Sequence, residues 1–142
     1  MATTSTARTH WQGSLTEGAG KTDLVTSGAA SFDMTWSARA EAGSGTTNPE
    51  ELLAAALATC YSMALSNALT TAGTPPTSLD TTVGVTFKPG TGITGATINV
   101  IGAVPGITAE TFNEFAEKTK TDCPVSQALS GIEKTLEVSF QS

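Results

Sequence analysis

Three short runs of alternating apolar and polar residues follow a polar stretch at the start of the chain. They cover residues 11–15, 22–26 and 31–36, and Gly18, Gly20 and Gly28 interrupt the pattern between them. A period of two is typical of strands with one covered face, so the pattern predicts a three-stranded meander. Residues 1–9 carry no such pattern, and we expect them to form a disordered polar tail.

The longest apolar run, residues 52–71, is rich in alanine and leucine and predicts a long helix. Asn48 can cap its start, Pro49 suits the first helical position, and Glu51 stands three residues after the cap. Gly73 marks its end, with two prolines just beyond. Because the run is apolar nearly all round, we expect the helix to be buried on several sides, at the centre of a domain or of a subunit interface.

Two further alternating runs, residues 79–88 and 93–104, flank the turn sequence PGTG and predict a β-hairpin. Thr108 begins an amphipathic pattern that continues to the Cys123-Pro124 pair, and residues 125–129 restart as a helical turn. Residues 132–140 alternate again as a strand. The prediction is an α+β fold in the order βββ-α-ββ-α-β, with residues 10–142 forming a single domain.

The charge balance excludes several partners. The net charge of −6 and the sequence pI of about 4.5 leave no basic surface for nucleic acid or for an anionic membrane. Polar residues interrupt the long apolar run, which therefore falls short of a membrane span, and residues 1–10 do not resemble a secretory signal. We expect a cytoplasmic protein. One histidine, no CxxC and no glycine-rich phosphate loop predict that it uses no metal or nucleotide cofactor.

Cys123 is the first candidate for chemistry. It stands directly before Pro124, at the start of the short helical turn. The free N–H groups and the dipole at a helix start favour a thiolate, so we expect the pKa of the Cys123 thiol to be lowered. The alternative is a capping cysteine with no chemistry.

Cys60 lies in the middle of the long apolar helix, where burial disfavours a thiolate and a core role is the simple interpretation. It reacts only if a cation approaches from another element. Of the seven Lys and Arg residues, six lie in segments expected to be tail, turn or outward face. Arg39, between the third predicted strand and a glycine-rich loop at 42–47, is the best-placed cation; a solvated arginine at a strand end is the alternative.

Glu50 and Glu51 stand in the first turn of the long predicted helix, where carboxylates often do no more than complement the helix dipole. Ten residues of straight helix separate Glu50 from Cys60 by about 15 Å. The two could share one site only if the helix is broken or if a second subunit brings one to the other.

Several motifs stand out along the chain, two of them around the cysteines: NPEELLAAALATCYSMAL at 48–65 and DCPVSQAL at 122–129, with AVPGI at 103–107, HWQG at 10–13 and GTPPTSLDTT at 73–82. Together they resemble the osmotically inducible protein C (OsmC) family. The resemblance extends from His10 to Phe140.

This resemblance implies a thiol-dependent peroxidase that needs no metal, haem or flavin and works as an intertwined homodimer with a site at each end of the interface. By the family pattern, Cys60 attacks the peroxide and Cys123 resolves the product as a disulfide, although the helix-end argument favours Cys123 as the more acidic thiol. Arg39 and Glu50 correspond to the family's arginine and glutamate; the first would stabilise the thiolate and hold the peroxide, and the second would fix the guanidinium. An external dithiol would reduce the disulfide.

The organic hydroperoxide resistance proteins, which are close relatives, place their arginine in the first hairpin. Residues 17–21 contain none, so the chain resembles the OsmC branch. Met34, Trp36 and Phe112 are expected as apolar walls that favour organic hydroperoxides, with hydrogen peroxide left open as a substrate. The expected role is defence against oxidative or osmotic stress. Two alternatives remain: a non-catalytic dimeric stress protein that binds an apolar ligand, and a cysteine redox sensor.

Overall fold

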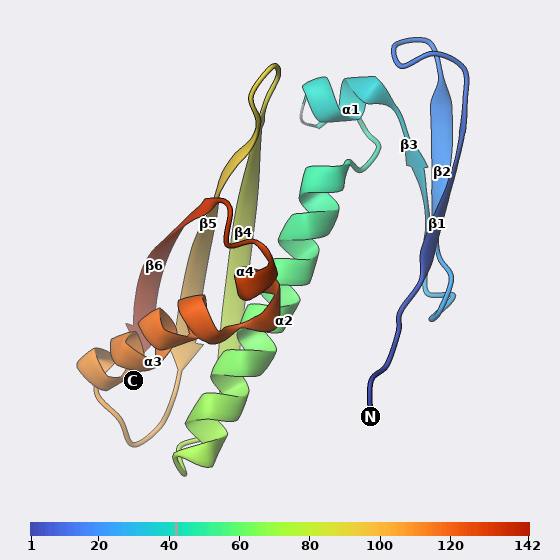
Figure 1. Cartoon of the computed structure of the whole chain (residues 1–142). Helices are drawn as coiled ribbons and strands as arrows, with labels where there is room; N and C mark the ends of the chain where they lie inside the picture. The colour runs from blue at the N-terminus through green and yellow to red at the C-terminus, as the bar shows by residue number, and fades with distance from the viewer. Residues whose placement is uncertain (42) are drawn as a thin grey trace. The chain divides into compact units, whose positions relative to one another are not determined.

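The computed structural model describes residues 1–41 and 43–142, so Ala42 of the expected loop lies outside the described residues. The chain divides into two compact units, Met1–Pro49 (unit 1) and Glu50–Ser142 (unit 2), and each is described by itself. Figure 1 follows the chain from unit 1 in blue and cyan to unit 2 in green through red.

Unit 1 contains a three-stranded antiparallel sheet. β1 (Ala7–Gln12), β2 (Ala19–Leu24) and β3 (Ser31–Met34) pair in the order β1-β2-β3, which confirms the predicted meander. β1 begins at Ala7, so residues 7–9 belong to the sheet and the expected tail is shorter. Every residue of β1 is exposed, which is why its start has no apolar signature, and Arg8 is held by an ion pair with Asp23 at 3.2 Å.

A short helix that the sequence pattern did not predict follows β3. α1 (Trp36–Ala40) begins after Thr35, whose Oγ1 accepts a hydrogen bond from the Ala38 N–H at 3.4 Å. This N-cap ends the strand two residues before the alternating pattern does. The consequence for function is that Arg39 lies on a helix and not at a strand end.

Unit 2 is built on a second three-stranded sheet. β4 (Ser78–Lys88) and β5 (Gly92–Ala103) form the predicted antiparallel hairpin. α3 (Ala109–Asp122) and α4 (Pro124–Ala128) then connect β5 to β6 (Glu133–Gln141), which pairs with β5 in parallel (Figure 1). The observed order is therefore βββ-αα-ββ-αα-β, which adds α1 to the expected order and makes the restarted turn a helix of its own.

The long helix α2 (Pro49–Thr71) starts and stops where the sequence predicts. Gly73 adopts a φ of 84°, and the Thr74 N–H donates to the Leu69 carbonyl at 2.9 Å, as in a Schellman stop. The helix packs one face into the core through four fully buried side chains, namely Leu57, Tyr61, Leu65 and Leu69.

The opposite face of α2 is open in the single chain, so α2 is not buried on several sides within its own domain, and burial at a subunit interface stays a prediction. Met63 is 68% exposed, and Ala55, Ala56 and Thr59 are also exposed. We expected the polar residues of this segment to make it too short for a membrane span. By length and composition alone, however, α2 could cross a membrane. The buried face of α2 contributes to the core cluster of unit 2.

Phe112 of α3 is the centre of the packing between helix and sheet. It is fully buried, its ring centroid lies 5.6 Å from that of Phe140, and a Cβ placed on Gly102 would come within 2.1 Å of its Cζ. Gly102 is therefore required for the close approach of this ring to β5. Phe112 is a core residue and not the open wall of a substrate site that we expected.

Candidate active site

The structure brings Cys60 and Cys123 together inside unit 2. Cys60 lies on α2 and Cys123 is the single residue between α3 and α4. The two side chains are neighbours in the core of unit 2, and Cys60 is one of the groups that raise the pKa of the Cys123 thiol. Both are free thiols; Cys60 is half-buried and Cys123 is fully buried. A disulfide between them would link α2 to the junction of α3 and α4.

The protonation of Cys123 differs from the sequence prediction. Burial raises the pKa of the Cys123 thiol, and the neighbouring Cys60 raises it further. The backbone N–H groups of Ser126 and Val125 act in the predicted direction and lower this pKa, but they do not outweigh burial. The predicted lowering of the pKa was wrong because the local sequence indicates that Cys123 stands at a helix start, but it does not indicate which distant residues bury its sulfur.

The other two predicted residues are on the first turn of α2 and on α1. Glu50 is in the first turn of α2 and is only 5% exposed. α2 runs without interruption from Glu50 to Cys60, so the helical rise keeps them about 15 Å apart within one chain. Arg39 is half-buried on α1, in unit 1. Of the two routes by which Glu50 and Cys60 could share a site, a broken helix is excluded.

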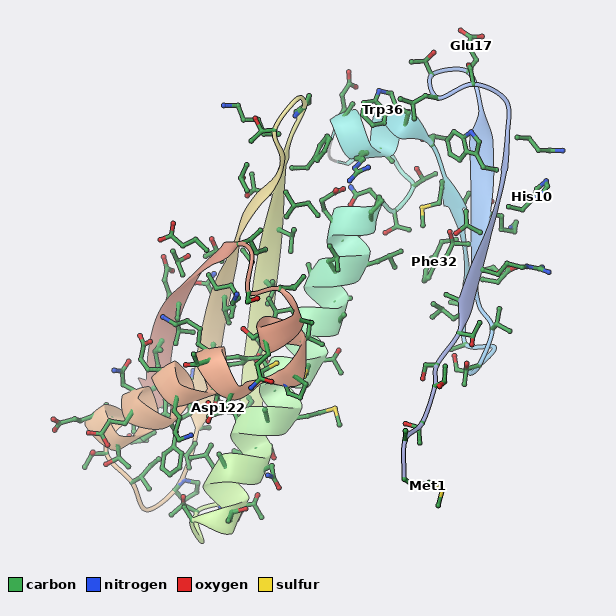
Figure 2. The ribbon with its side chains drawn as sticks, viewed as in Figure 1. Met1, His10, Glu17, Phe32, Trp36 and Asp122 are labelled. Atoms are coloured by element: carbon green, nitrogen blue, oxygen red, sulfur yellow. The ribbon has the colours of Figure 1, made fainter. Side chains whose placement is uncertain are left out.

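A groove of about 330 Å³ lies between α2 and α3, and two of its lining residues are close to the cysteines in the sequence. Ala64 follows Cys60 by one helical turn, and Asp122 directly precedes Cys123 at the end of α3 (Figure 2). Three apolar side chains contribute to the lining, and an ion pair between Lys118 and Asp122 borders it. The full lining is Ala64, Asn67, Ala68, Phe115, Lys118, Thr119 and Asp122.

Lys134, like Arg39, lies in a different environment from the one that the sequence pattern predicted. It was expected on an outward face, but it is half-buried, and its Nζ donates to the carbonyls of Leu129 at 2.8 Å and Ile132 at 3.2 Å. Lys134 therefore stabilises the turn between α4 and β6. Among residues 1–41 and 43–142, no group of three or more His, Cys, Asp or Glu side chains could hold a metal ion.

The chain is similar to known proteins over nearly all of its length. It is 41% identical over 136 residues to Peroxiredoxin OsmC of Escherichia coli (strain K12), which covers 94% of each chain. A solved organic hydroperoxide resistance protein from Elizabethkingia anophelis is 28% identical, with a TM-score of 0.69 over 99% of this chain and 100% of that one. The fold also matches a Legionella pneumophila protein described as an organic hydroperoxide resistance protein OsmC, with a TM-score of 0.72, 24% identity and 98% of both chains covered.

The family comparison agrees with these relatives and with the resemblance in the cysteine motifs. A family model described as OsmC-like protein matches residues 42–138, a range that contains both cysteines, α2 and the whole sheet of unit 2 up to Val138. The chain belongs to the OsmC-like protein family.

Proposed function

We propose that this chain is a thiol peroxidase that reduces organic hydroperoxides. The single observation that carries the proposal is that Cys60 and Cys123 come from separate elements of unit 2 and are neighbours in its core. The name Peroxiredoxin OsmC of the relative that is 41% identical supports the same reaction class.

The proposed reaction has two chemical steps in the protein. The Cys60 thiolate attacks one peroxide oxygen, the O–O bond breaks, and an alkoxide leaves and takes up a proton as the alcohol. Cys60 is then a sulfenic acid. The Cys123 sulfur attacks the Cys60 sulfur, the S–S bond forms as the S–O bond breaks, and water leaves. An external dithiol reduces the disulfide and completes the cycle.

The different burial of the two thiols supports this order of events. Cys60 is half-buried and can be reached from outside, whereas Cys123 is fully buried and its thiol has a raised pKa. A protonated, covered thiol is a poor first nucleophile, since the thiolate is the reactive form. Cys123 is suited to react only with a sulfenic acid that forms beside it.

Arg39 and Glu50 complete the proposed site. The Arg39 guanidinium would stabilise the Cys60 thiolate and hold the peroxide, and the Glu50 carboxylate would fix the guanidinium by a bidentate pair. A carboxylate as buried as that of Glu50 is expected to have a cationic partner. Because α2 is continuous, we propose that the Glu50 that serves Cys60 comes from a partner subunit.

An intertwined homodimer would supply that partner. The open face of α2, with Met63 68% exposed, offers an apolar surface for a second copy. In the dimer, residues 10–142 would act as one OsmC-like domain, with a site at each end of the interface. Sedimentation of the full chain tests this assembly, and a stable monomer at low micromolar concentration would contradict it.

The groove between α2 and α3 is the proposed place for the organic group of the hydroperoxide. Its apolar residues are Ala64, Ala68 and Phe115, and its volume of about 330 Å³ lies at the lower end of the range for small-ligand pockets. These residues take the role that we first expected of Phe112. The need for an external dithiol agrees with a reducing compartment, and we propose a cytoplasmic location.

A single-turnover experiment tests the function. The pre-reduced chain is mixed with one equivalent of cumene hydroperoxide, and free thiols are counted and mapped by mass spectrometry, with Cys60→Ser as the matched control. We expect two thiols per chain to disappear within seconds, with a disulfide between Cys60 and Cys123. If both thiols stay free after an hour, the chain is better described as a ligand-binding stress protein. Very slow turnover with every dithiol supplied would favour a redox sensor.

A further inference from the structure

The position of Cys123 depends on the helices on either side of it. Asp122 ends α3 and Pro124 begins α4, so Cys123 is the one residue at the corner between them. Its N–H donates to the Thr119 carbonyl at 3.0 Å, and its carbonyl accepts from the Gln127 N–H at 2.9 Å. These backbone bonds hold Cys123 to both helices but do not set the angle between them.

Ser126 sets that angle by binding the Lys120 carbonyl, which receives no backbone hydrogen bond from Pro124. In a regular helix the Lys120 carbonyl would accept from the N–H four residues later, but that residue is Pro124, which has none. The Ser126 hydroxyl donates to this carbonyl at 2.5 Å, and Ser126 is only 2% exposed. The bond ties α4 to the end of α3 and so fixes the corner at Cys123.

Tyr61 provides a second hydrogen bond from a side-chain hydroxyl to a backbone carbonyl, and this bond joins α2 to α3. It is the residue after Cys60, it is fully buried, and its hydroxyl donates to the Ala116 carbonyl at 2.9 Å. Burial raises the pKa of Tyr61, and the nearby Glu117 and Cys123 raise it further, so the phenol stays a donor. Tyr61 thus joins α3 to α2 one residue from the attacking sulfur.

We propose that Tyr61 and Ser126 are positioning residues that hold the Cys123 sulfur at the Cys60 sulfur for the disulfide-forming step. The proposal rests on the proposed function, in which Cys123 attacks the Cys60 sulfenic acid and water leaves. Tyr61 fixes α3 against α2, and Ser126 fixes α4 against α3. Neither residue takes part in the attack of Cys60 on the peroxide. Loss of either bond therefore affects the second step alone.

The test follows the two steps separately in the full, pre-reduced chain after one equivalent of cumene hydroperoxide. Dimedone trapping reports sulfenic acid, and mass spectrometry reports the disulfide. In Tyr61→Phe and Ser126→Ala we expect sulfenic acid to form at the unmutated rate, but the disulfide to form roughly tenfold to a hundredfold more slowly, since small displacements of reacting atoms cost that much. Ser126→Thr keeps a hydroxyl and should restore the fast second step.

Ser62→Ala is the matched control. The Ser62 hydroxyl also joins two elements, because it contacts Thr81 of β4 at 2.7 Å, but it has no part in the α3–α4 corner. We expect it to leave both steps at the unmutated rate. Tyr61→Phe keeps the buried ring, so it decides the question even if Ser126→Ala does not fold.

Two results overturn the proposal: disulfide formation at the unmutated rate in Tyr61→Phe, or an equal slowing of both steps in the two variants. Failure of the proposed function gives a different result, since the unmutated chain would then form neither sulfenic acid nor disulfide.

Discussion

Unit 1 and unit 2 differ in how much core each one builds. Unit 2 buries a continuous apolar cluster between α2, α3 and its sheet, whereas the buried apolar side chains among the described residues of unit 1 are Met34 and Ala38. Unit 1 also exposes Trp11, Leu15 and Val25. A core of two side chains does not stabilise about fifty residues, so unit 1 needs further contacts to be stable.

The difference separates two parts of the proposed chemistry. Both thiols and the bonds that position them belong to unit 2, where packing is dense. Arg39, the proposed activator, belongs to unit 1. Disulfide formation should therefore depend on the core of unit 2, and peroxide activation on a residue outside that core.

The largest expected effect comes from removing the attacking sulfur. Cys60→Ser should lower peroxide consumption by several orders of magnitude, because a hydroxyl does not replace the thiolate. Cys123→Ser should still consume one equivalent of peroxide and then stop as the sulfenic acid. Peroxide consumption in the absence of added dithiol measures both. Equal loss in the two variants would contradict the assigned order.

Arg39→Ala should have the next largest effect on the reaction. We expect the second-order rate constant with cumene hydroperoxide to fall by roughly a hundredfold, as when one charge-stabilising donor is removed from an active site. The free energy of unfolding should also fall, because the buried Glu50 carboxylate would lose its proposed cation, but by less than the activation free energy rises. Stopped-flow kinetics and urea unfolding give the two values, with Arg39→Lys as control. If the free energy of unfolding fell by as much as the activation free energy rose, Arg39 would have a structural role instead.

Gly102→Ala tests the dense packing of unit 2. The added Cβ would collide with the ring of Phe112, and we expect a loss of about 1–3 kcal/mol in the free energy of unfolding. Gly84→Ala is the matched control, since Gly84 lies on β4 and a Cβ added there would meet no heavy atom within 4 Å beyond its chain neighbours. It should change the unfolding free energy by less than about 0.5 kcal/mol. Equal costs at both glycines would mean that α3 moves freely to accommodate the methyl group.

The smallest expected effect is on the pH dependence of stability. The folded chain holds the Cys123 proton more tightly than the unfolded chain does, since burial raises the pKa of this thiol. The resulting stabilisation is complete below the unfolded thiol pKa of about 8.5 and is lost as the pH rises through the folded pKa. Under reducing conditions, stability should begin to fall above about pH 8.5, and it should fall more steeply with pH in the unmutated chain than in Cys123→Ala. Parallel profiles would show that Cys123 does not contribute.

Local signals predicted those parts of the structure that local interactions determine. Pro49 and Gly73 marked the ends of α2, and the PGTG turn marked the β4–β5 hairpin. The motifs also identified the two cysteines that the structure brings together. The alternating pattern hid α1, because Trp36 continues the period of the strand while Thr35 already caps a helix.

Features that depend on distant residues were not predictable from local patterns. The parallel pairing of β5 with β6 requires the whole α3–α4 connection, and nothing within either strand indicates it. The raised pKa of Cys123 depends on burial by residues far along the chain. The groove between α2 and α3 arises only when α3 packs against α2, so neither Ala68 nor Phe115 showed a functional signal.

The parallel pairing of β5 with β6 also determines at which stage of folding Cys123 comes next to Cys60. A hairpin such as β4–β5 closes through a short turn, but Thr97 and Thr135, which are hydrogen-bonded across β5 and β6, are 38 residues apart in sequence. Closing such a long loop is slow, so the corner that carries Cys123 docks late in folding. Until then Cys60 lacks its resolving partner, and an oxidant that meets the nascent chain would carry it past the sulfenic acid to irreversible products. Synthesis under oxidative stress should therefore yield a fraction of permanently inactive molecules.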